Sequence, residues 1–119
     1  MAELIVDGEE LELKLGRAEK LESMHGSLRV PISSISSVEV LDDAHKAADI
    51  IGFKVGTRIP GVVEVASVHG RDKKIFACVH RDTPRGVRVI LAGTEHDEWV
   101  VGCSDPEGSA ALINSRLMK

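Results

Sequence analysis

The sequence predicts a mainly β fold, a seven-stranded antiparallel barrel closed by one C-terminal α-helix. Three observations lead to this prediction. Apolar and polar residues alternate along much of the chain, turn signals separate these runs, and a helical pattern closes the chain. The 119 residues fit one domain, and no linker, internal repeat or low-complexity segment divides them.

The first two strands are predicted to form a hairpin. Leu4–Val6 and Leu11–Leu15 flank an Asp-Gly dipeptide at 7–8, and Asp-Gly between apolar runs is a strong hairpin signal. The leucines of the second run should face the core. The segment Arg17–His25 then predicts a short helix or turn, ended by Gly26.

The next segments predict an edge strand, a longer strand and a short helix. Pro31 lacks a backbone donor, so Leu28–Ile32 is expected at an edge of the sheet. Val38–Leu41 is a better strand. Asp42 and Asp43 are suited to cap a short helix that extends through residue 49.

The residues from 50 to 61 are apolar but interrupted by glycines and end in a Pro-Gly turn, which predicts an irregular loop. Regular alternation returns after this loop. We expect a four-stranded meander made of Val62–His69, Lys74–His80, Val87–Leu91 and Glu98–Cys103.

The last segment predicts the closing helix. Asp105 is suited to the N-cap, Pro106 to the first helical position and Glu107 to the positive end of the helix dipole. The helix should turn an apolar stripe toward the barrel. We expect its residues Ala110, Leu112, Ile113 and Leu117 to share one core with Trp99.

Composition excludes some functions. The formal net charge is −4 and the aromatic content is 3%, so neither phosphate neutralisation nor base stacking is favoured, and no nucleic-acid partner is expected. No leader-like or transmembrane-length apolar run is present. We therefore expect a cytoplasmic protein whose Cys78 and Cys103 remain reduced.

No motif indicates catalysis or a cofactor. The sequence has no serine elbow, phosphate loop or dinucleotide fingerprint, so an enzyme is the poorer hypothesis. Cys78 and His80 lie two apart on a predicted strand, with Cys103 or His69 as further candidate ligands. Nothing in the spacing supplies four ligands, so no metal is expected.

Three phrases resemble small bacterial pleckstrin-homology-like (PH-like) domain proteins of actinobacterial type. They are residues 30–40, the loop from Gly52 to Val62, and the ending from Trp99 to Glu107. The resemblance implies a PH-like barrel in a largely uncharacterised group, some of whose members self-assemble. Eukaryotic relatives bind phosphoinositides or peptides, but the acidic loop 7–10 argues against phosphoinositide binding here.

Two surfaces are candidates for binding. The first is the 50–61 loop, where Phe53, Lys54 and Arg58 place an apolar group beside two cations that suit an amphipathic or anionic partner. The alternative is that its apolar residues fold back over the barrel mouth, which is the commoner outcome. The second is a basic rim formed by residues between 69 and 88, and its alternative is a solvated set of charges.

Three hypotheses for function follow. The leading one is a non-enzymatic binding or assembly module that contacts a protein partner, or a second copy, through the strand edge near Pro31 or the 50–61 loop. The second is a barrel that carries a small apolar ligand. The third is an enzyme, which would need a cleft with a perturbed histidine or carboxylate.

Overall fold

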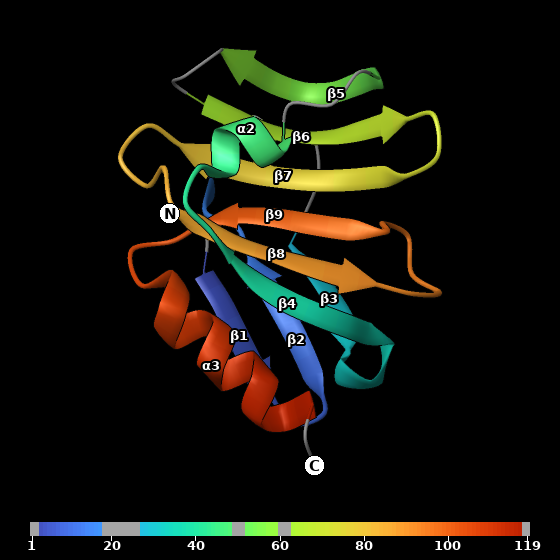
Figure 1. Ribbon diagram of the computed structural model, residues 1–119. Coiled ribbons are helices and arrows are strands. Elements are labelled where there is room, and N and C mark those ends of the chain that lie inside the picture. Colours follow the sequence, from blue (N-terminus) through green and yellow to red (C-terminus); the bar gives the residue numbers. More distant parts are fainter. Residues whose placement is uncertain (1–2, 18–26, 49–51, 60–62, 118–119) are drawn as a thin grey trace.

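Two β-sheets pack face to face and a C-terminal helix lies along their side in the computed structural model (Figure 1). Residues 3–17, 27–48, 52–59 and 63–117 are described. The small sheet is antiparallel and has the order β1 (Glu3–Asp7), β2 (Glu10–Lys14), β3 (Leu28–Pro31).

The large sheet has six strands. Their order is β4 (Ile35–Leu41), β8 (Gly86–Leu91), β9 (Glu98–Gly102), β7 (Lys74–His80), β6 (Val63–Gly70) and β5 (Gly52–Ile59). The helical elements are η1 (Ile32–Ser34), α2 (Ala44–Ala48) and α3 (Pro106–Leu117). The described residues thus form a mainly β fold with a C-terminal helix.

The predicted closed barrel of seven strands is wrong, because the nine described strands form two separate sheets. A closed barrel would require hydrogen-bonded ladders at both junctions between the sheets, and none joins them among the described strands. Instead α3 packs against β4 and contacts β1, so side chains bridge the two sheets in place of a β-ladder. Its buried residues Ala110 and Ile113 belong to the core between the sheets.

The predicted meander is wrong at its last two strands. β9 lies between β7 and β8, antiparallel to β8 but parallel to β7, with Trp99 opposite Phe76. All five residues of β9 are buried. A strand covered on both faces belongs at the centre of a sheet, and the uninterrupted apolar run at 99–101 is typical of such a strand.

Each face of the large sheet has its own core. The larger core fills the space between the sheets, where Phe76 and Trp99 pack with Leu11 and Leu13 of the hairpin. The smaller core lies on the opposite face, where Ala44 and other residues of α2 cover β7 and β9. One face of the sheet is therefore closed by strands and the other by a short helix.

The turn and cap predictions are confirmed where they can be compared. The hairpin turns at Gly8, whose φ of 62° suits glycine. The Asp43 carboxylate accepts a hydrogen bond from the Lys46 amide at 3.1 Å, and that of Asp105 accepts one from the Gly108 amide at 3.0 Å.

Two other predictions concern helices. The helix expected over Arg17–His25 lies outside the described residues apart from Arg17. In α3, Ile113 faces the core as expected, but the predicted burial of Leu112 is wrong, because 49% of this residue is exposed. Leu112 neighbours the buried position on the helix and so points to a different side.

Candidate functional site

The segment predicted as an irregular loop contains a regular strand. β5 pairs with β6 over its whole length, from Gly52 opposite Gly70 to Ile59 opposite Val63. The loop prediction is therefore wrong for residues 52–59, while residues 50, 51, 60 and 61 lie outside the described part.

The glycines that suggested a loop permit close strand pairing. Gly56 has a φ of 136°, and a Cβ built there would lie 2.4 Å from the carbonyl oxygen of Val65. A Cβ at Gly52 would lie 2.4 Å from the carbonyl oxygen of His69. Glycine in a strand often marks such a close approach between two backbones, and here it occurs twice on one strand.

β5 forms one end of the large sheet, and β6 is its only strand neighbour among the described residues. In Figure 1 it lies at the end of the molecule opposite α3 and the small sheet. Phe53 and Ile59 are 70% and 52% exposed. The alternative in which these two side chains cover a barrel mouth is therefore wrong, because β5 extends beyond the region that the small sheet covers.

The two faces of β5 differ in chemistry. Side chains alternate along a strand, so Phe53 and Ile59 share one face while Lys54 and Arg58 share the other. The Phe53 ring meets the ring of His69 edge-on, with centroids 6.1 Å apart. The three predicted binding residues thus come together on one strand, with the apolar group and the cations on opposite faces.

Arg58 is fixed against the sheet by a buried carboxylate. Its Nε lies 2.7 Å from Oε1 of Glu64, whose side chain is almost fully buried. Glu64 stands directly opposite Arg58 in the register of β5 and β6. A charge-assisted hydrogen bond of this kind compensates for the burial of the carboxylate and holds the guanidinium at the sheet edge.

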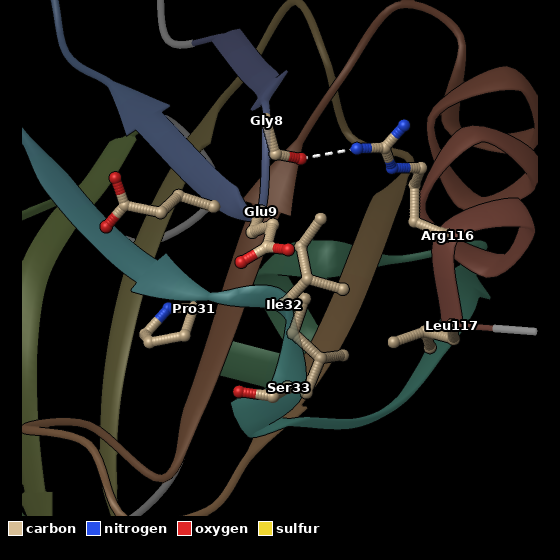
Figure 2. Close-up of a pocket in the computed structure, with 9 residues that line it drawn as sticks. Gly8, Glu9, Pro31, Ile32, Ser33, Arg116 and Leu117 are labelled. Atoms are coloured by element: carbon tan, nitrogen blue, oxygen red, sulfur yellow. Dashed lines mark hydrogen bonds between the residues drawn. The ribbon is translucent and has the colours of Figure 1, made fainter. Parts of the chain in front are cut away.

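A second feature, missed by sequence reasoning, is a surface groove of about 630 Å³ beside the first hairpin. Figure 2 shows Ile32 and Leu117 facing the groove, and Arg116 donating a hydrogen bond to the Gly8 carbonyl oxygen. The exposed carboxylate of Glu9 lies on the hairpin side. The lining comes from three segments far apart in the chain, so no local pattern indicates it.

A buried serine and histidine also meet across the fold. Ser67 Oγ lies 3.0 Å from Nε2 of His96, and the His96 ring meets Phe76 edge-on at 5.4 Å. Such a pair can activate a hydroxyl for nucleophilic attack. Ser67 is only 6% exposed and His96 only 1%, so both side chains are buried, and their contact fastens the β8–β9 loop to β6.

The predicted basic rim is divided by ion pairs. Arg88 contacts Glu39 at 2.6 Å and Glu98 at 3.0 Å, and Lys73 contacts Glu98 at 3.3 Å. Arg85 binds Glu107, which raises the pKa of the guanidinium and lowers that of the carboxyl group. These three cations are therefore each held by a neighbouring carboxylate, and Glu98 is shared by two of them.

No metal centre is found among the described residues, since no three of their His, Cys, Asp or Glu side chains group closely enough to hold an ion. Both cysteines are free thiols. Burial is the main reason that the pKa of Cys103 is raised, which favours the unreactive thiol over the nucleophilic thiolate.

The comparisons do not add a family. Searches against family models, curated proteins and solved structures gave no match to this chain. None of the described helices is long and apolar enough to cross a membrane. The resemblance to PH-like domains therefore remains a prediction from the sequence.

Proposed function

We propose that this chain is a non-enzymatic binding module that receives an extended segment of a protein partner on the outer edge of β5. The observation that carries the proposal is the position of β5 at the end of the large sheet with Phe53 and Ile59 exposed. An edge strand is a template for a further strand, and exposed apolar side chains give the added strand specific contacts.

The other sheet edges are poorer candidates. β1 contacts α3, and β4 packs against the same helix. β3, which contains Pro31, has only four residues, and proline supplies no donor for pairing. β5 has eight residues and contains no proline. The 50–61 region is therefore a better site for an added strand than the edge near Pro31.

A binding role is also better supported than a ligand carrier or an enzyme. The interior between the sheets is filled by Trp99, Phe76 and aliphatic side chains, which disfavours a carrier with an internal cavity. An enzyme would need an accessible reactive group, and the buried Ser67–His96 pair does not provide one. A kinship with PH-like domains is compatible with this binding role and is part of the proposal.

Site-specific photocrosslinking tests the proposal. A photoreactive amino acid at Phe53 should give a crosslinked protein adduct in the host cell, because the side chain lies beside the receiving edge. The matched control places the same group at Leu112, an exposed apolar position on α3. Equal adducts from both positions, or none from position 53, would contradict the proposal.

Native mass spectrometry then identifies the class of partner. A multiple of the chain mass identifies a second copy, and the chain plus another polypeptide identifies a different protein. A monomer that carries a reproducible small-molecule mass would instead support the carrier hypothesis.

A further inference from the structure

We infer that the segment received by β5 is the β5 strand of a second copy of this chain, paired antiparallel about a two-fold axis at Gly56. This inference rests on the proposed function and names its partner. The positions of the two exposed apolar residues along β5 and the geometry of antiparallel pairing lead to it.

Antiparallel geometry restricts how two copies of β5 can pair. Along a strand, the backbone N–H and C=O groups of successive residues point alternately to one side and the other, and opposed residues either both point toward each other or both point away. In a pair of identical strands, an odd-numbered residue therefore faces an odd-numbered one and an even-numbered residue faces an even-numbered one. One allowed register places the two-fold axis at Gly56 and opposes residues 53–59 of both copies.

This register brings the exposed apolar side chains together. Phe53 is 70% exposed and Ile59 is 52% exposed, and they lie three residues before and three residues after Gly56. Each Phe53 would stand opposite Ile59 of the second copy, and the axis repeats the pair. Cross-strand pairs of an aromatic and a β-branched residue are stabilising. The allowed registers shifted by two residues would instead place Thr57 opposite Phe53, or Val55 opposite Ile59.

The charged face of β5 is compatible with the same register. Lys54 would stand opposite Arg58 of the second copy, but the Arg58 guanidinium is already paired with the buried carboxylate of Glu64 at 2.7 Å. Gly56 lies diagonally across from both cations and has no side chain, which leaves room for their long side chains to diverge. The charges of the edge therefore do not exclude a second copy.

A two-fold pair of this kind closes at two copies. Each copy uses its β5 edge once, with β6 on the other side of the strand, so the two large sheets would join into one continuous sheet. Closed two-fold dimers are the commonest oligomers of soluble proteins. A single strand ladder is at the small end of protein interfaces, so we expect a dissociation constant on the order of 1–100 μM.

Sedimentation velocity over a concentration series tests the inference. The chain should pass from monomer to dimer without larger species. Phe53→Glu should raise the dissociation constant about tenfold or more, because a carboxylate would replace the ring opposite Ile59. The matched control is Leu112→Glu, at an exposed apolar position of α3, which should leave the constant unchanged. A chain that stays monomeric at about 1 mM, or equal effects of both variants, would overturn the inference.

Mixed disulfides test the register. A copy with Phe53→Cys and a copy with Ile59→Cys would hold their thiols opposite each other, with Cα atoms about 5 Å apart, which suits a disulfide. Either variant alone would hold its two new thiols roughly 20 Å apart. Oxidation should therefore crosslink the mixture but neither variant alone, and the unsubstituted chain controls for Cys78 and Cys103. Equal crosslinking of one variant alone and of the mixture would overturn the inference.

Failure of the inference and failure of the proposed function give different results. A monomeric chain that crosslinks through position 53 to a different polypeptide would overturn the second copy and support the binding edge. A monomeric chain that gives no adduct at this position would contradict both.

Discussion

β5 and β9 belong to the same sheet but differ in nearly every physical respect. All five residues of β9 are buried, with strands on both sides and a core on each face. β5 has β6 on one side, and Phe53 and Ile59 are exposed. The comparison teaches that apolar residues stabilise the fold at the centre of the sheet and are available for binding at its end.

The largest expected effect on stability comes from removing α3, which packs against β4 of the large sheet and contacts β1 of the small sheet. A chain ending at residue 103 loses Ala110 and Ile113 from the main core and uncovers β4. It should lose cooperative unfolding in thermal melts followed by circular dichroism. An unchanged melting temperature would show that β9 and its neighbours do not need the helix.

The next largest effect on stability comes from a substitution on β9, which we compare with one on β5. Trp99→Ala should lower the free energy of unfolding by about 3–5 kcal/mol, because it leaves a large cavity between the sheets. Phe53→Ala should change it by less than about 0.5 kcal/mol, since the ring is mostly exposed. Urea denaturation measures both values. Similar losses would contradict the division between a structural centre and a binding edge.

A smaller effect is expected from Gly56→Ala, which sharpens the comparison at the edge. The φ of 136° and the contact of the new Cβ with the Val65 carbonyl oxygen should cost about 1–3 kcal/mol. Hydrogen exchange should then rise in β5 before it rises in β9. The matched control is Gly93→Ala, where φ is 75° but no atom lies within 4 Å of the new Cβ. A larger loss of stability for Gly93→Ala than for Gly56→Ala would show that the close approach of the β5 and β6 backbones does not determine this loss.

The smallest effect concerns Glu107, an exposed carboxylate on α3 rather than on either strand. Its hydrogen bond to Arg85 lowers its pKa in the folded chain. Its contribution to stability is therefore present above the ordinary glutamate pKa and is lost as the pH falls through the lowered folded value. NMR titration should show the Glu107 pKa rising in Arg85→Gln. An unchanged value would mean that the exposed pair is not formed in solution.

The local features of the fold were predictable from sequence, whereas the pairing of distant strands was not. Asp-Gly at 7–8, Asp43 and Asp105 each act on residues within one turn, so their roles follow from neighbouring sequence. The insertion of β9 between β7 and β8 depends on burial from both faces. Only the unbroken apolar run at 99–101 signals this position.

The candidate site was predictable in its residues but not in its form. Phe53, Lys54 and Arg58 were selected because apolar and cationic groups lie close together in the chain. The glycines at 52 and 56 indicated a loop, because sequence alone does not show that they permit close contact with β6. The groove beside Arg116 and the Ser67–His96 pair join segments distant in the chain and carry no local pattern.

Amide hydrogen exchange of the free chain and of the chain bound to the partner that photocrosslinking at position 53 captures tests the central claim most directly. In the free chain, β5 should exchange faster than β9, because β6 is its one strand neighbour in the part of the chain that the structure describes. The bound partner should slow exchange in β5 and leave β1, β3 and β4 unchanged. Protection at one of those other edges, or no change in β5, would contradict the account of β5 as the receiving strand.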